Sequence, residues 1–367
     1  MIKLGFFTGA RSEYGLMKGL LKQLMEDPGI DISLIVGGLH FLEEFGNTVS
    51  EIDKDKIPIA KKLPFFVEGR SPTYADFADA VVKIADELSE QSYNALFLVG
   101  DRIETYAAAL AAHFTGTSII HSGGGTLTLG AKDNMYRYNI TNLAEIHLAT
   151  SKGNYNRLID LPIISTDNVY LTGSFAIDSI KDYKQKEVPI QNFVHGLKDN
   201  KFALITFHPA TSKPEKLDEI LIESVRYIIS KGNQVLITYP NNDPGYESLV
   251  AAIKFLEHLN DVYIVKSLGA TGYYAALKSC QFVLGNSSSG IIEAPYFNKP
   301  VINLGSRQEG REKDQGIIDV EAHTQAVIEQ LDRGYKKGWP EIPGTEIYGN
   351  GNSIKKIIRI IHTHYDT

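Results

Sequence analysis

The chain has 367 residues, a length that predicts two domains of about 150 to 200 residues each. Hydrophobic residues make up 43% and charged residues 22%, which is ordinary for a globular protein, and no apolar run approaches the roughly 18 residues that span a bilayer. The formal net charge is -7 and no long block of Lys or Arg is present, which argues against nucleic acid or a membrane surface as a partner.

The N-terminus, MIKLGFFTGA, has a short apolar run that passes directly into a glycine turn, so we expect a buried first strand rather than a signal peptide. The single cysteine, Cys280, excludes an intrachain disulfide framework and fits a reducing compartment. Together these features predict a soluble, cytoplasmic protein.

Short apolar runs alternate with longer amphipathic segments along the whole chain. The runs are LGFFTG, ISLIVGG, ALFLVGD, TSIIHSGGG and IHLATS in the first half, and FALITFHP, QVLITYPNND, VYIVKSLG, FVLGNSSSG and PVINLGSR in the second. Continuously apolar strands separated by helices indicate parallel sheets with both faces covered. We therefore expect an α/β protein with two Rossmann-like domains, residues 1–173 and 174–345, and a boundary near Thr172 to Ser174.

The polar signatures of the chain follow directly after these expected strands. They are TGARSEYG, GGLHF, GDRIE, HSGGG, HPAT, YPNND and GNSSSG. In open parallel sheets the ligand lies beyond the carboxyl ends of the strands, where loops enter helices. We expect the two sheets to present these loops to a cleft between the domains.

The segment GNSSSGIIEAP predicts a strand, a serine loop and a helix. Ser287 or Ser288 can cap the helix, and the N–H groups of its first turn can hold a phosphate with help from the helix dipole. Three serines followed by Gly290 exceed what a cap needs, which favours phosphate binding over capping alone. Glu293 is placed to accept hydrogen bonds from ligand hydroxyls such as those of a ribose.

Two further loops of the first half carry charged residues. In TGARSEYG, Gly9 permits a tight turn and Arg11 offers a planar cation for a phosphate or a surface ion pair. Neither a P-loop nor a G-x-G-x-x-G follows a strand, which disfavours an NTPase or a nicotinamide enzyme. GDRIE places Asp101, Arg102 and Glu104 where helix capping explains carboxylates, and a general base at Asp101 would require burial.

Histidines end three of the expected strands. A lone His208 is more often a packed residue than a catalyst, but His40 and His121 at comparable positions strengthen a functional interpretation. No metal-binding spacing such as H-E-x-x-H is present, so we expect no metal. In RQEGR, Arg307 and Arg311 suit a diphosphate, or simply a soluble surface.

Taken together, these segments resemble the UDP-N-acetylglucosamine 2-epimerases, particularly the hydrolysing branch of sialic-acid, legionaminic-acid and related biosynthesis. The resemblance covers most of the chain. It is carried by GARSEYGLMKGLL, GLHFLEEFGNT, GDRIE, GAKDNMYRYNIT, FHPAT, GNSSSGIIEAP, INLGSRQEGR and the terminal YGNGNSIKKI. The serine segment followed by RQ-x-GR at this spacing is highly specific to that group.

The resemblance implies a GT-B-like fold, with two Rossmann-like domains around a deep cleft and a C-terminal helix within 346–367 that returns to the first domain. It also implies a homodimer or homotetramer that binds a UDP-sugar without a cofactor. The implied diphosphate and nucleotide ligands are Arg11, Ser287, Ser288, Ser289, Gly290, Glu293 and Arg307. The implied reacting groups are Asp101, Asp133 and His208, and the sugar-side candidates are His40, Arg102, Glu104 and Arg137.

In the family reaction, the C2 proton of UDP-N-acetylglucosamine is removed, UDP is expelled to leave a glycal, and water adds to give free N-acetylmannosamine. A diphosphate leaving group needs positive charge and N–H donors, and proton removal needs a positioned base. Two interpretations of other classes stay open: a GT-B glycosyltransferase, and a sugar-nucleotide-binding protein without turnover.

One segment departs from the family. Hydrolysing relatives carry HIEGGE or HIHGGE where this chain has HSGGGT, so Gly123 and Thr126 replace side chains that include a carboxylate assigned to acid/base work. Either Asp101, Asp133 and His208 suffice, or the sugar differs, or the chemistry is lost. The additional glycine leaves room for a bulkier substituent, which makes a UDP- or GDP-linked 2,4-diacetamido-2,4,6-trideoxyhexose an alternative substrate.

Overall fold

The computed structural model describes residues 1–43, 46–129, 133–210, 215–240, 245–340, 342 and 344–366. The chain forms two compact units: unit 1 comprises Met1–Thr126, Asp133–Ser179 and Tyr348–Thr367, and unit 2 comprises Leu127–Lys132 and Ile180–Ile347. The main division therefore follows Ser179, whereas the sequence predicted a boundary between residues 173 and 174. None of the helices in the described ranges combines the length and apolar character needed to cross a bilayer.

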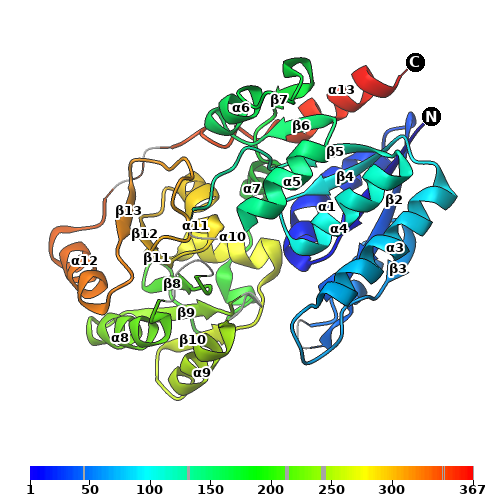
Figure 1. Ribbon diagram of the computed structural model, residues 1–367. Coiled ribbons are helices and arrows are strands. Elements are labelled where there is room, and N and C mark those ends of the chain that lie inside the picture. The colour runs from blue at the N-terminus through cyan, green and yellow to red at the C-terminus, as the bar shows by residue number, and fades with distance from the viewer. Residues whose placement is uncertain are drawn as a thin grey trace. The chain divides into compact units, whose positions relative to one another are not determined.

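Unit 1 contains a seven-stranded parallel sheet with the order β3-β2-β1-β4-β5-β6-β7 (Figure 1). Its strands are β1 Ile2–Thr8, β2 Ile30–Gly37, β3 Ile59–Leu63, β4 Ala95–Val99, β5 Ser118–Ser122, β6 Ile146–Ala149 and β7 Val169–Leu171. Its helices are α1 Arg11–Met25, α2 Val49–Lys54, α3 Tyr74–Gln91, α4 Ile103–Thr115, α5 Asp133–Leu143, α6 Lys152–Ile159 and α13 Ser353–Tyr365, with 3-10 turns η1 Gly38–Phe41 and η3 Thr166–Asn168. Helix α7, Phe175–Lys186, spans the division between the units.

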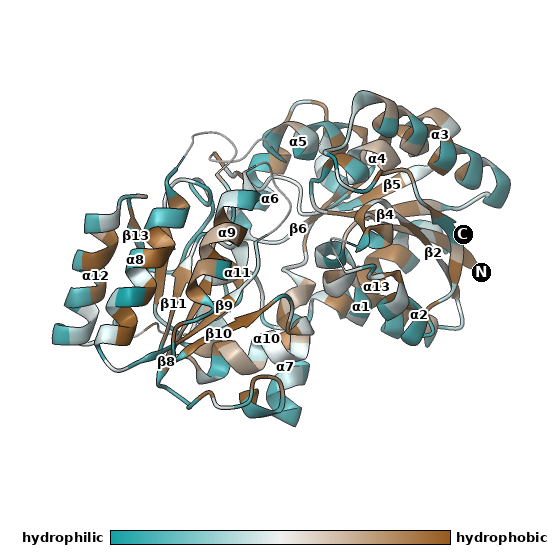
Figure 2. Ribbon diagram, turned by 90° about the horizontal axis from the view of Figure 1, so that it is seen from below, coloured by the Kyte–Doolittle hydropathy of each residue, from teal (hydrophilic) through white to brown (hydrophobic). Residues whose placement is uncertain are grey.

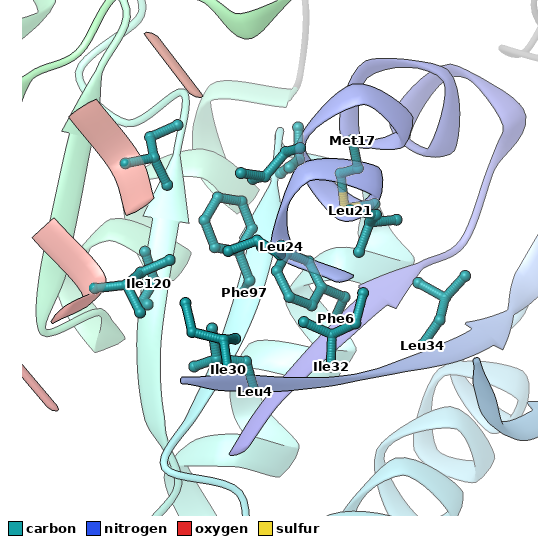
Figure 3. Packing of buried hydrophobic residues seen from close by; sticks show 14 of the residues in the cluster. Leu4, Phe6, Met17, Leu21, Leu24, Ile30, Ile32, Leu34, Phe97 and Ile120 are labelled. Atoms are coloured by element: carbon teal, nitrogen blue, oxygen red, sulfur yellow. The ribbon is translucent and has the colours of Figure 1, made fainter. Parts of the chain in front are cut away.

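The strands of unit 1 are apolar on both faces because helices cover both faces. On one face, Phe6 stacks on Phe97 with ring centroids 4.9 Å apart, and residues of α1 and α13 pack against them (Figure 3). On the other face, Phe7 and Ile35 pack against α3 and α4. Adjacent residues of β1 thus point to opposite sides, as the two-residue period of a strand requires.

Unit 2 contains a six-stranded parallel sheet with the order β10-β9-β8-β11-β12-β13. Its strands are β8 Phe202–Thr206, β9 Gln234–Thr238, β10 Val262–Val265, β11 Phe282–Gly285, β12 Val301–Leu304 and β13 Ile317–Val320. Its helices are α8 Leu217–Ser230, α9 Tyr246–Leu256, α10 Gly269–Ser279, α11 Ser288–Ile292 and α12 Thr324–Lys337, with 3-10 turns η4 Ile190–Asn192 and η5 Ala294–Phe297. Most strand residues are hydrophobic, with Asn303 of β12 and Asp319 of β13 among the exceptions, whereas the helices carry both hydrophobic and hydrophilic residues (Figure 2).

The C-terminal helix α13 is part of unit 1. Its apolar stripe, which includes Ile357 and Ile361, is buried in the core cluster that contains β1 and α1. Asp178 of α7 accepts hydrogen bonds from the N–H groups of Ser353 (3.1 Å) and Ile354 (3.2 Å), which caps the start of the helix. The helix is thus held by apolar burial along one face and by a carboxylate at its N-terminus.

A histidine fastens the other end of α13. The Nε2–H of His362 donates to Asp27 (2.9 Å) and its Nδ1–H donates to Asp366 (2.6 Å). Carboxylates only accept hydrogen bonds, so the ring carries both protons, and these partners raise the pKa of His362 above its ordinary value.

We expect the His362 contacts to give unit 1 a pH-dependent increment of stability. When folding raises the pKa of a histidine, the histidine stabilises the folded state fully at pH values below its unfolded pKa of about 6.5. This stabilisation is lost as the pH rises through the folded pKa. Urea midpoints measured between about pH 5.5 and pH 9 should therefore fall more steeply for wild type than for His362→Gln. The exposed His258 provides a control, since His258→Gln should follow the wild-type profile; parallel profiles for all three proteins would contradict the expectation.

Candidate functional site

The order of strands reverses at one point in each sheet. In unit 1 the reversal lies between β1 and β4, and in unit 2 it lies between β8 and β11. Loops that leave the carboxyl ends of two such strands run in opposite directions and leave a ligand position between them. These loops are TGARSEYG and GDRIE in unit 1, and FHPAT and GNSSSG in unit 2, which are the segments that the sequence singled out.

The loop after β1 is held by two buried carboxylates. Glu13 accepts hydrogen bonds from the N–H groups of Gly9 (2.7 Å) and Ala10 (3.2 Å) and from the hydroxyl of Thr105 (2.6 Å). Burial and the neighbouring carboxylate of Glu104 raise the pKa of Glu13. The exposed Arg11 is the first residue of α1, so this carboxylate fixes the turn from which Arg11 projects.

Glu104 lies in the first turn of α4 and is 1% exposed. Its Oε1 accepts a hydrogen bond from Nε of Arg102 (2.9 Å), whereas its Oε2 is buried without a hydrogen-bond partner. Both residues were sugar-side candidates. The structure assembles them into an ion pair at the start of α4, with Glu104 packed under the β1 loop.

Asp101 follows β4 and is paired with a buried arginine. Arg137 of α5 is 1% exposed, and its Nη2 donates to the carboxylate of Asp101. Its Nη1 donates to the backbone oxygen of Thr126 (2.8 Å) and to the side chain of Asn134 (2.5 Å). One guanidinium therefore joins the loop after β4, the loop after β5 and the start of α5, where Asp133 is the first helical residue.

The HSGGGT segment comprises the last two residues of β5 and the start of the loop that follows, 123–126. The hydroxyl of Thr126 accepts a hydrogen bond from the amide of Asn154 (2.9 Å), and Arg157 donates to the backbone oxygen of Gly125 (3.1 Å). A Cβ added at Gly123 would contact only backbone atoms of Gly100, at 3.8 Å, so there is space beside it. However, Gly123 has φ +102°, a conformation that residues with a side chain rarely adopt.

His40 and His121 are buried and have a partner on each ring nitrogen. His40 contacts the hydroxyls of Thr8 (2.9 Å) and Thr48 (2.7 Å). His121 donates from Nε2 to the backbone oxygen of Gly100 (2.8 Å), and its Nδ1 contacts Thr141 (3.3 Å). Burial lowers the pKa of each histidine to about 4, so both rings are neutral and hold loops in place.

The serine row of unit 2 forms a short capped turn. The side chain of Ser287 accepts a hydrogen bond from the N–H of Ser289 (3.4 Å) at the start of α11, and the hydroxyl of Ser289 contacts that of Tyr273. Helix α11 has five residues, so the helix dipole contributes less to anion binding than the sequence suggested. The strand before it approaches β8 closely, because a Cβ at Gly285 would lie 2.0 Å from the backbone oxygen of Thr206.

Glu293 is the residue that follows α11. Gly290, three residues earlier, lies next to the side chain of Val301. Its carboxylate accepts a long hydrogen bond from the hydroxyl of Tyr274 (3.5 Å). Burial raises the pKa of Glu293 to about 7. An ionised carboxylate at this position would gain from hydrogen-bond donors such as ligand hydroxyls.

His208, the serine loop and Arg307 meet at one buried residue, Asn286. The side-chain amide of Asn286 bonds both the N–H and the backbone oxygen of His208, each at 2.7 Å. The backbone oxygen of Asn286 accepts from Arg307 (3.2 Å) and Gln308 (2.9 Å). Burial and the charge of Arg307 keep the pKa of His208 well below its ordinary value, so its ring is neutral.

The predicted residues thus form two clusters. Unit 1 brings together Asp101, Arg102, Glu104, Arg137 and the loops of Arg11 and His40, and unit 2 brings together His208, Ser287, Ser288, Ser289, Gly290, Glu293 and Arg307. Parts of four predicted segments lie outside the described residues: 44–45 of GLHFLEEFGNT, 130–132 of GAKDNMYRYNIT, Thr211 of FHPAT and 241–243 of YPNND. Within the described residues, no three His, Cys, Asp or Glu side chains converge in a way that could hold a metal ion.

Comparison with known proteins identifies the family. A family model described as UDP-N-acetylglucosamine 2-epimerase matches residues 22–362. The chain belongs to the UDP-N-acetylglucosamine 2-epimerase family. It is 30% identical to UDP-N,N'-diacetylbacillosamine 2-epimerase (hydrolyzing) of Legionella pneumophila, over 98% of this chain and 96% of the relative. It is 27% identical to GDP/UDP-N,N'-diacetylbacillosamine 2-epimerase (hydrolyzing) of Campylobacter jejuni, over 91% and 87%.

Solved structures of the family share the fold. The UDP-N-acetylglucosamine 2-epimerase of Neisseria meningitidis, solved bound to UDP-GlcNAc, superposes with a TM-score of 0.81 at 18% identity, covering 99% of this chain and 100% of that one. The enzyme of Methanocaldococcus jannaschii, in complex with UDP-GlcNAc and UDP, gives the same TM-score at 15% identity, with 99% and 100% covered. The predicted family and the predicted GT-B-like pair of parallel-sheet domains are confirmed.

Sequence reasoning missed the residues that hold the loops. Glu13, Asn286 and Gln308 were not singled out, although each lies within two residues of a candidate. An amide at the end of the apolar strand FVLG was a signal for Asn286, since a polar side chain buried there needs partners. No such signal exists for the contact of Asn154 with Thr126, which joins residues 28 positions apart.

We expect Arg137→Met to destabilise unit 1 by about 3 kcal/mol, the lower end of the range for breaking a buried ion pair, because Asp101 keeps some solvent contact. The substitution also leaves the buried backbone oxygen of Thr126 without this donor. Urea unfolding measures the change. Arg333→Met, at an exposed position of α12, should shift stability by less than about 0.5 kcal/mol, and an equally small shift for Arg137→Met would refute the tethering role.

Proposed function

We propose that the protein is a hydrolysing 2-epimerase that releases UDP from a UDP-linked 2-acetamido sugar. The observation that carries the proposal is a fixed carboxylate, Asp101, at the strand reversal of unit 1. The similarity to relatives named as hydrolysing 2-epimerases, which for one covers 98% of the chain, supports the same assignment. A cytoplasmic homodimer or homotetramer that needs no cofactor belongs to this proposal.

The proposed reaction proceeds in two steps. A base removes the proton from C2 while the bond between C1 and the diphosphate oxygen breaks, so that a C1=C2 double bond forms and UDP leaves. Water then adds its oxygen to C1, and C2 receives a proton on the opposite face. Asp101 is only partly buried, whereas the sequence predicted that a base there would require burial, but Arg137 holds it in place. We assign the C2 base to Asp101, with Asp133 and the neutral His208 as the further proton carriers.

The nucleotide is assigned to side chains that can stabilise a leaving diphosphate. Arg11 and Arg307 supply positive charge, and the hydroxyls and N–H groups of 287–290 supply donors to phosphate oxygens. The carboxylate of Glu293 is assigned to the ribose hydroxyls. The stabilisation from these donors increases as negative charge develops on the departing UDP.

For the sugar we favour a 2,4-diacetamido-2,4,6-trideoxyhexose of the diacetylbacillosamine type over N-acetylglucosamine. A Cβ at Gly123 would meet only backbone atoms of Gly100, at 3.8 Å, and we assign the additional acetamido group to the side of the sugar that faces this glycine. Two of the hydrolysing relatives are named for that substrate. N-acetylglucosamine, the first expectation from sequence, stays as the second candidate because the matched family is described by it.

The decisive experiment follows proton NMR of the protein in D2O with UDP-N,N'-diacetylbacillosamine and UDP-N-acetylglucosamine side by side. We expect free 2-epimerised sugar with deuterium at C2, together with UDP, and faster turnover of the diacetamido sugar. Asp101→Asn should still bind UDP by calorimetry and lose at least about a hundredfold in turnover.

Other outcomes of that experiment identify the competing functions. Retained hydrogen at C2, with transfer of the sugar to an added acceptor, would indicate a glycosyltransferase. Nucleotide-bound epimer would indicate a nonhydrolysing epimerase. UDP binding without release from either sugar would indicate a binding protein, and GDP-linked sugars in the same assay test the choice of base.

The raised pKa of Glu293 predicts a pH-dependent affinity for UDP. Because ribose hydroxyls donate to the ionised carboxylate, a ligand lowers its pKa from about 7, and affinity should weaken as pH falls through that value. Calorimetry of UDP binding between about pH 5.5 and pH 8.5 should show a smaller pH dependence for Glu293→Gln than for wild type. Identical profiles would contradict the ribose assignment, because any ionisation of UDP itself is common to both proteins.

A further inference from the structure

We propose that Asn286 and Gln308 are positioning residues with separate tasks: the side chain of Asn286 aligns His208, and Gln308 aligns the serine loop that receives the diphosphate. This inference rests on the proposed function and extends it to residues that do not touch the substrate. All of the contacts that carry it lie within unit 2.

The side chain of Asn286 acts on His208 alone among the contacts recorded for it. Asn286 is fully buried, and its amide pairs with both polar groups of the His208 backbone at 2.7 Å. Such a two-point bond fixes the direction in which the peptide of His208 faces. Since His208 lies two residues after the end of β8, the orientation of its imidazole depends on this bond.

The backbone of Asn286 serves different partners. Its N–H donates to the backbone oxygen of Thr206 (3.3 Å), and its carbonyl accepts from Nε2 of Gln308 (2.9 Å) and from Arg307. Because Ser287 is the next residue, these bonds set where the serine row begins. A change in the Asn286 side chain leaves the carbonyl in place, so the two functions are separable by mutation.

Gln308 has a feature that a purely structural role does not explain. It is 1% exposed, and its Oε1 is buried without a hydrogen-bond partner. A methionine of similar length would remove this unsatisfied acceptor as well as the donor to Asn286. Gln308→Met is therefore not expected to lower folding stability, and any loss of ligand binding is attributable to the donor.

The test is a comparison of kcat and UDP affinity in matched variants. We expect Asn286→Ala to lower kcat about 10- to 100-fold while the Kd for UDP, measured by calorimetry, changes less than about threefold. We expect Gln308→Met to raise the Kd for UDP about three- to tenfold, the value of one hydrogen bond, with kcat nearly unchanged. Asn286→Asp keeps the acceptor for the His208 N–H but loses the donor to the His208 oxygen, so it should also lower kcat with little change in the Kd for UDP, and it replaces Asn286→Ala in the test if that variant fails to fold.

A matched control is Gln234→Met. Gln234 is also a buried amide with several hydrogen bonds, but it lies at the amino end of β9, away from these loops, so stability alone should change. Two results would overturn the positioning roles. One is that each variant loses kcat and UDP affinity to the same extent; the other is that neither variant loses kcat or UDP affinity while its melting temperature is unchanged. A wild-type protein that binds no UDP and releases none would overturn the proposed function as well.

Discussion

Polar groups buried at the carboxyl ends of parallel strands must find partners inside the protein, and this constraint shapes both candidate clusters. Each unmatched group costs about 1–3 kcal/mol. In unit 1 the guanidinium of Arg137 satisfies groups from three segments, and in unit 2 Asn286 bonds groups of two loops and joins them to its own. The loops that carry Asp101 and His208 are consequently fixed before any ligand binds, which is the condition for electrostatic preorganisation.

The same need for buried partners explains how the histidines at the strand ends are held. His40 and His121 use both ring nitrogens to join segments of the chain, and burial keeps them uncharged. A neutral imidazole with both nitrogens occupied is suited to holding a loop rather than to moving a proton. His208 is neutral as well, and the side chain of Asn286 holds it by its backbone N–H and backbone oxygen.

The fold was predictable because its determinants are local. Apolar runs such as FALIT become strands buried on both faces, and the loops after them lie at the expected sheet edges. The candidate site was predictable only in part. Arg137 was expected on the sugar side, yet it is buried against Asp101, 36 positions away in sequence, and no periodicity reports such a pairing. The roles of Glu13 and Gln308 likewise depend on contacts that only the folded chain creates.

The HSGGGT segment is tied into the scaffold of unit 1 by its own hydrogen bonds. The hydroxyl of Thr126 accepts a hydrogen bond from Asn154 and its carbonyl accepts one from Arg137, so both polar groups of this residue are used by the scaffold. A glutamate at Gly123 would have space but would require a backbone conformation that side chains disfavour. A carboxylate at position 123 would therefore require the backbone of this loop to change, and for this reason the proposed reaction is assigned to Asp101, Asp133 and His208.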